Sequence, residues 1–83
     1  MYLAIRDTQT GSLLEHKKQV LLFLEKFEAM MVCKSYQESY GDHFEVENYG
    51  VNPAGGVDYQ GALKEMQGKI LVPFIVPLDK NIS

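Results

Sequence analysis

The sequence is poor in cysteine and, over a long central stretch, has no basic residues. Its 83 residues include one cysteine, Cys33, so no internal disulfide can hold the fold together. Cys33 follows the apolar stretch Met30–Val32, and we expect it to be a small buried hydrophobic residue. No Lys or Arg lies between Ser35 and Leu63, and Lys17–Lys18 is the only adjacent lysine pair. Because a nucleic-acid binder needs a basic stripe, the sequence argues against duplex binding.

Long apolar runs and an export leader are also missing. The apolar run Val20–Leu24 is far shorter than the roughly 20 residues that span a bilayer. The first residues, Met1–Arg6, lack a charged leader followed by a long apolar stretch. We therefore expect a cytoplasmic protein that does not enter a membrane.

Motifs of common catalytic and cofactor sites are absent as well. The sequence has no G-x-S-x-G, paired-cysteine or H-E-x-x-H motif. Gly55–Gly56 precedes a predicted helix, but phosphate-binding loops need a defined glycine spacing, and Asp58 would repel an anion there. Cys33 with His16 or His43 is a poor nucleophile–base pair, because a catalytic thiolate needs an electropositive setting. We expect no cofactor.

The composition that remains is that of one small globular domain. Hydrophobic residues make up 46% and charged residues 23%, with a formal net charge of −3. This is ordinary usage for a folded protein and not that of a disordered one. Residues 1–83 are too few for two cores, so we predict a single acidic domain with a polar C-terminal tail at 79–83.

The stretch Ser12–Val32 predicts one long amphipathic helix. Ser12 and Glu15 have the spacing of a capping box, and apolar residues then recur at helical intervals. The alternative is a hairpin, in which the turn cluster 7–11 joins a first strand at Tyr2–Arg6 to a second strand containing Leu13–Leu14. The helix interpretation places four apolar residues against a sheet: Val20, Leu24, Phe27 and Met31.

The middle of the chain allows two interpretations. Residues 34–40 can form a strand, followed by a turn at Gly41–Asp42, or they can continue the long helix, with Gly41 as its C-terminal cap. The segment His43–Glu47 alternates polar and apolar residues. It therefore predicts a strand with Phe44 and Val46 facing the core.

The last third predicts a loop, a short helix and an edge strand. Gly50–Gly56 is rich in residues that break regular structure, and Asp58 can cap a helix at Tyr59–Gln67 with Leu63 and Met66 facing inward. Ile70–Leu78 is apolar but contains two prolines, which favour a sheet edge. The predicted fold is an α+β domain of order β-α-β-β-α-β, the split βαβ or ferredoxin-like pattern.

Tyrosines and carboxylates in the segment without basic residues are the first candidate binding site. Such side chains can hold a Lys- or Arg-bearing partner through cation–π contacts and charge-assisted hydrogen bonds. Ordinary packing in strands is the alternative role for the aromatic residues. The candidate residues are Tyr36, Tyr40, Tyr49, Tyr59, Glu45 and Glu47.

A second candidate site uses three alternating residues of one predicted strand. His43, Glu45 and Glu47 project from the same face, and a histidine with two carboxylates can ligate zinc, manganese or iron. The alternative is a solvated strand face without metal. We take the metal-free face as the expectation, and keep a small enzyme based on His43 as the alternative function.

The function that the sequence favours is a non-enzymatic interaction or ligand-binding module that self-associates and can take a basic protein partner. A domain this small cannot cover all of its apolar residues alone. We therefore expect a homodimer, formed either by the outer face of the long helix near Leu22 or by the Ile70–Leu78 edge.

Overall fold

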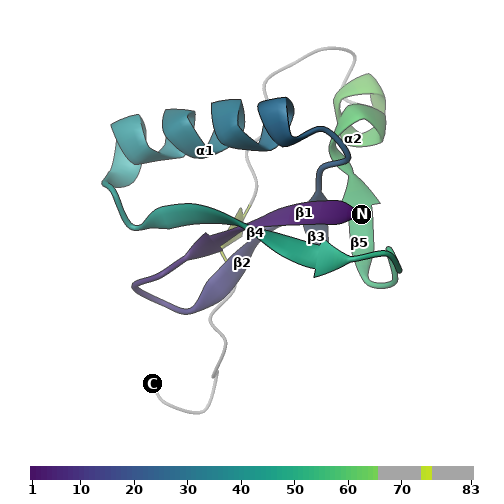
Figure 1. Cartoon of the computed structure of the whole chain (residues 1–83), viewed down its shortest axis with the longest axis horizontal. Coiled ribbons are helices and arrows are strands. Elements are labelled where there is room, and N and C mark those ends of the chain that lie inside the picture. The colour runs from purple at the N-terminus through teal and green to yellow at the C-terminus, as the bar shows by residue number, and fades with distance from the viewer. Residues whose placement is uncertain (66–73, 76–83) are drawn as a thin grey trace.

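The computed structural model describes residues 1–65 and 74–75 of the chain. These residues form an α+β domain in which a mixed sheet carries two helices (Figure 1). In chain order the elements are β1 (Tyr2–Asp7), β2 (Ser12–His16), β3 (Gln19–Leu22), α1 (Lys26–Tyr40), β4 (Phe44–Gly50), β5 (Gly56–Asp58), α2 (Tyr59–Glu65) and β6 (Phe74–Ile75).

The first strand lies inside the sheet, because β1 pairs antiparallel with both β2 and β4. The path across the sheet is β4-β1-β2-β3-β5, and β6 joins the side of β2. Only β3 and β5, among the described strands, pair in parallel. Helix α1 runs along β1 and β4 on one face, and α2 stands near β5 (Figure 1). The long helix therefore lies close to the β4 edge.

The predicted helix Ser12–Val32 is wrong except for residues 26–32, which belong to α1. The hairpin alternative is confirmed, because β1 pairs antiparallel with β2, with Arg6 opposite Leu13. Strands β2 and β3 occupy residues 12–22, joined by the two-residue turn Lys17–Lys18. Three residues of β2 face inward, and two of them, Ser12 and His16, are polar. Their polarity hides the period of two that would mark a strand, so the apolar residues that remain match helical spacing instead.

Residues 34–40 belong to helix α1, so the strand interpretation is wrong and the continuation of the helix is confirmed. The helix ends at Gly41, whose φ is 117° and whose N–H donates to the carbonyl oxygen of Gln37 at 2.9 Å. Glycine tolerates this backbone conformation because it has no Cβ. Buried Ala29 and Cys33 define the side of α1 that packs on the sheet.

Helix α1 begins at Lys26 and not at Ser12, and this later start changes which apolar residues are buried. The predicted core positions Leu24, Phe27 and Met31 are exposed. Leu22, predicted on the outer side of a helix, is a fully buried residue of β3. The predicted dimer surface near Leu22 is therefore not a surface of the molecule.

Several shorter predictions are confirmed. Tyr2–Arg6 lies in a strand, residues 8–11 of the predicted turn 7–11 form a turn, and Phe44 in β4 is buried. Asp58 accepts a hydrogen bond from the Gly61 N–H at 3.2 Å, as expected of a residue that caps α2. Of the predicted strand 70–78, Phe74–Ile75 is seen as β6; its other residues, Met66 and the tail lie outside the described residues.

The core lies between the sheet and its two helices. The α+β class is confirmed, whereas the ferredoxin-like order is not, because three strands precede the first helix. In the described part of the chain, neither helix is long and apolar enough to cross a membrane. The buried cluster consists of Ile5, Leu14, Leu21, Phe23, Ala29, Cys33, Phe44 and Ala62.

Candidate functional site

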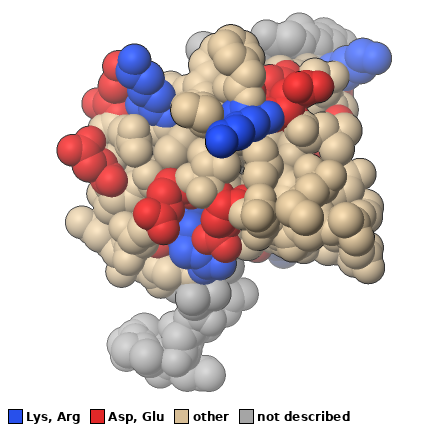
Figure 2. All heavy atoms as spheres, in the orientation of Figure 1, with Lys and Arg blue, Asp and Glu red and all other residues tan. Residues whose placement is uncertain are grey.

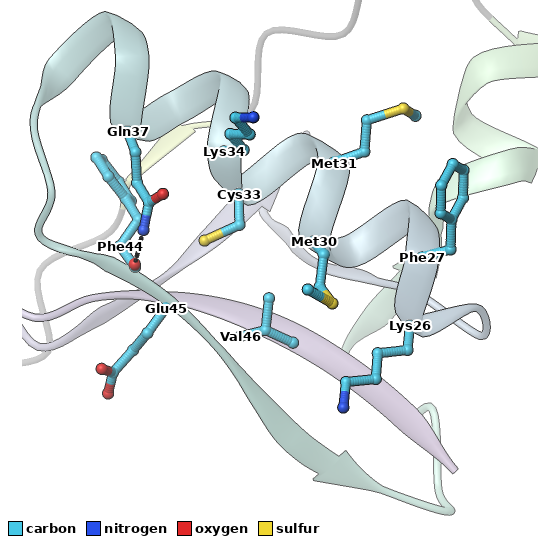
Figure 3. A pocket seen from close by; sticks show the side chains of 10 residues that line it. All are labelled: Lys26, Phe27, Met30, Met31, Cys33, Lys34, Gln37, Phe44, Glu45 and Val46. Atoms are coloured by element: carbon cyan, nitrogen blue, oxygen red, sulfur yellow. Dashed lines mark hydrogen bonds between the residues drawn. The ribbon is translucent and has the colours of Figure 1, made fainter.

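An open groove runs between helix α1 and strand β4, with a volume of about 700 Å³ (Figure 3). Seven of its ten lining residues come from the helix and three from the strand. We call it the α1–β4 groove, and its residues are Lys26, Phe27, Met30, Met31, Cys33, Lys34, Gln37, Phe44, Glu45 and Val46.

Large apolar side chains stand exposed along the helix wall of the groove. Phe27 is 74% exposed, Met30 54% and Met31 52%. Met30 points from the helix toward Val46, whereas Phe27 and Met31 point away from the sheet (Figure 3). Leu24, just before the helix, is 56% exposed. We call Leu24, Phe27, Met30 and Met31 the helix patch.

Charged side chains flank this apolar surface. Lys26 and Lys34 come from the helix and are exposed. Glu45 points from β4 to the side of the strand away from α1 (Figure 3). The apolar middle of the groove is therefore bordered by two lysines, with Glu45 directed away from α1. An apolar centre with a polar rim is typical of protein-contact surfaces.

The C-terminal end of α1 is fixed to β4 by a hydrogen bond and by aromatic contacts. The Gln37 side-chain amide donates to the Phe44 carbonyl oxygen at 2.9 Å. Tyr36 lies 5.5 Å from both Tyr40 and Phe44, measured between ring centroids. Burial, with a smaller effect of Tyr40, raises the pKa of Tyr36 to about 12. These contacts attach the C-terminal end of α1 to β4.

Cys33 faces the floor of the groove but is not an activated nucleophile. Its side chain is buried, at 5% exposure. Burial, together with the charge of Glu45, raises the pKa of the Cys33 thiol. A raised pKa keeps the thiol protonated, so Cys33 behaves as the small hydrophobic residue expected from the sequence.

The four candidate tyrosines do not lie on one surface. Tyr36 and Tyr40 meet at the end of α1. The Tyr49 hydroxyl donates to the Ala54 carbonyl oxygen at 2.7 Å, within the loop that follows β4. Tyr59 stacks on Phe23 with ring centroids 4.9 Å apart. Burial raises the pKa of the Tyr59 hydroxyl, and the charge of Glu28 adds a smaller increase. Each tyrosine therefore has a partner inside the chain.

The two glutamates and the histidine of the candidate sites also have different surroundings. Glu47 forms an ion pair with Arg6 of β1, and this pair raises the pKa of Arg6. His43 Nε2 lies 3.8 Å from Asp7 Oδ1, and its ring stacks on Phe44. Glu45 is exposed and lines the groove. Within residues 1–65 and 74–75, no group of three or more His, Cys, Asp or Glu side chains is placed to hold a metal ion.

Sequence reasoning missed the helix patch because it assigned those residues to the core. The information that locates it is the start of the helix. Once α1 begins at Lys26, Ala29 and Cys33 share the inward side, and Phe27 and Met31 fall on the outward side. The hairpin alternative, followed through, would have given this start.

Comparison with protein-family models, curated proteins and solved structures gives no match for this chain.

Proposed function

We propose that this protein is a non-enzymatic interaction module and that it contacts its partner protein through the α1–β4 groove and the helix patch. One observation carries the proposal: four large apolar side chains, Leu24 just before α1 and Phe27, Met30 and Met31 in its first turns, stand exposed at 52% to 74%. Single exposed apolar residues are common on proteins, but a contiguous patch marks an interaction site.

The composition of the surface supports the same function. Aromatic residues and methionine are enriched where proteins bind each other, and methionine adapts its shape to a partner. Two groups of the walls that a small-molecule site could use are not free for it: Cys33 is protonated, and the Gln37 side-chain amide donates to the Phe44 carbonyl oxygen. An enzyme based on His43 gains less support, since Glu47 already pairs with Arg6.

Photo-crosslinking in the cells that produce the protein tests the proposal. A photoreactive amino acid replaces Met31, whose side chain points away from the sheet (Figure 3). We expect discrete protein adducts from this position. The matched control carries the same amino acid at Gln9, an exposed residue of the turn between β1 and β2, and should give none.

A second chain, carrying Phe27→Asp as well as the photoreactive group at position 31, should lose the adducts. Phe27 is 74% exposed, so the substitution leaves the core untouched. Absence of adducts from position 31, or equal adducts from positions 9 and 31, would show that this surface is not used for recognition.

A further inference from the structure

We infer that the partner bound at this surface is a second copy of the same chain, with the outward sides of the two α1 helices packed antiparallel across a two-fold axis at the level of residue 29. The inference rests on the proposed function and adds the identity of the partner. It requires that the surface be large enough, complementary to itself in shape and complementary to itself in charge.

The helix patch has the apolar area that a dimer of this size needs. Its four side chains, each half to three-quarters exposed, offer on the order of 100 Å² each, or about 400 Å² per copy. A standard interface buries about 800 Å² per partner, of which somewhat more than half is apolar. The patch therefore supplies nearly all of the apolar share.

The spacing of the patch suits two-fold packing of helices. Phe27 and Met31 lie one turn apart on the outward side of α1, opposite buried Ala29 and Cys33. When two α1 helices cross at the level of residue 29, Phe27 of each copy lies over Met31 of the other. Sulfur–aromatic contacts of this kind are favourable.

Charges at the edge of the patch match in the same arrangement. Lys34 lies on the outward side with Phe27 and Met31 (Figure 3), and the crossing at residue 29 places it opposite residue 24 of the other copy. The exposed Glu25 next to that residue is within reach of the long lysine side chain. Two Lys34–Glu25 pairs therefore form by symmetry. The charged residues at this end of α1, Glu25, Lys26, Glu28 and Lys34, carry no net charge together, which suits a copy of the chain better than a strongly basic or acidic partner. Figure 2 shows basic and acidic side chains interspersed over α1.

The free edge of β4 is the competing dimer surface, and its charges argue against it. β4 pairs with β1 alone among the described strands. Two β4 strands paired antiparallel about a two-fold axis set residues of the same face opposite each other, so Glu45 and Glu47 would meet glutamates of the other copy. Like charges directly opposite destabilise a strand pair.

Sedimentation equilibrium of the full chain tests the inference. We expect a mass of twice 9.4 kDa in the micromolar range. Phe27→Ser should raise the dissociation constant at least about thirtyfold, as loss of a central aromatic residue does. The matched control is Val51→Ser, which removes a 77% exposed apolar side chain outside the patch and should leave the constant unchanged.

A charge exchange tests the geometry. Lys34→Glu and Glu25→Lys should each raise the dissociation constant about tenfold, because both pairs of the dimer become repulsive. An equimolar mixture of the two variants should form a heterodimer at least as tight as the parent dimer. Glu45→Lys should change nothing, whereas it would strengthen a dimer formed by the β4 edges.

The outcomes separate the two proposals. A mass of 9.4 kDa at every concentration overturns the dimer, and adducts from position 31 with another protein would still uphold the interaction module. A dimer that ignores Phe27→Ser, or that Glu45→Lys strengthens, overturns the helix-to-helix arrangement. Absence of adducts in cells together with a monomer removes both.

Discussion

Lys17 and Lys18 are the only described residues other than glycine with positive φ, at 53° and 67°. They form the two-residue turn between β2 and β3, where both central residues adopt the left-handed conformation. Asparagine and glycine are the usual residues there, because a side chain with a Cβ is strained in it. Lys17 has a compensating contact, since its Nζ lies 2.8 Å from Glu65 Oε1. Lys18 forms no ion pair with another of the described residues.

Lys18→Gly is therefore expected to raise the free energy of unfolding by about 0.5–1 kcal/mol through relief of this strain. The measurement is chemical denaturation at neutral pH. Gln19→Gly is the control, because Gln19 is a strand residue of β3 and glycine there should lower stability. Equal effects of the two substitutions would mean that the turn carries no strain.

Gly56 and Gly61 are expected to respond in opposite ways to alanine. A Cβ at Gly56 would lie 2.3 Å from Leu22 Cδ1 and 3.1 Å from the Val20 carbonyl oxygen. Leu22 is fully buried, so the cost of Gly56→Ala should be about 1–3 kcal/mol. Gly61 lies in α2, and a Cβ there meets only Asp58 Oδ2 at 3.9 Å.

Gly61→Ala should stabilise the protein by about 0.5–1 kcal/mol, since alanine favours a helix over glycine. Thermal unfolding of both variants beside the parent gives the comparison. A neutral effect at Gly56 would contradict the close packing of β5 on Leu22 of β3, and destabilisation by alanine at Gly61 would contradict the helical conformation of α2.

The placement of α1 and β3 can be tested with two leucines that are two positions apart. Leu22 is fully buried in β3 and Leu24 is 56% exposed. Leu22→Ala should cost about 2–5 kcal/mol, the usual range for a buried leucine. Leu24→Ala should change stability by no more than about 0.5 kcal/mol, as surface substitutions do. Urea denaturation at protein concentrations below those of dimer formation measures both losses of stability. A larger loss for Leu24→Ala than for Leu22→Ala would favour the single long helix predicted from the sequence.

The attachment of α1 to β4 is expected to weaken at high pH through Tyr36. Burial raises the pKa of its hydroxyl from 10 to about 12, so the folded state holds its proton where the unfolded state releases it. The stability that comes from the protonated hydroxyl is present below pH 10 and is lost as the pH rises toward 12. Denaturation as a function of pH should show a smaller loss over this range for Tyr36→Phe than for the parent. An identical loss would mean that Tyr36 is accessible to solvent.

Elements with simple side-chain patterns could be predicted from the sequence, and those with polar inner faces could not. Strand β1 buries the apolar residues Ala4 and Ile5 beside a single polar residue, Asp7, and the β4 segment alternates clearly, so both were found. Strand β2 places Ser12 and His16 in the interior, where neither side chain finds a hydrogen-bond partner among the described residues. Two lysines at the next turn gave no turn signal, because lysine rarely adopts positive φ.

The candidate site could not be predicted from the sequence either, because the polar inward residues of β2 hid where α1 begins. Its residues were visible in the sequence, but whether Phe27 and Met31 face the core or the solvent depends on where α1 begins. That start depends in turn on the hairpin hidden by Ser12 and His16. The tyrosine segment was chosen by composition alone, and composition does not show that Tyr49 and Tyr59 have partners within the chain.

At the scale of the whole molecule, self-association through the helix patch would make stability depend on protein concentration. Only folded chains associate into the dimer, so mass action raises the melting temperature as the protein concentration increases. We expect this rise for the parent chain and for Val51→Ser, and its absence for Phe27→Ser. Differential scanning calorimetry over a hundredfold range of concentration gives the measurement. A rise that persists in Phe27→Ser would place the association elsewhere.

The position of β1 between β2 and β4 also determines the order in which the chain can fold. The β2–β3 turn closes over two residues, whereas the contact between Arg6 and Glu47 joins residues 41 positions apart. Closing the longer loop costs more entropy before any contact repays it. The N-terminal hairpins should therefore form early, and β4 should reach β1 late, carrying α1 onto the sheet with it. The outer edge of β1 would then be open to other chains during folding, and that interval is when aggregation is most probable.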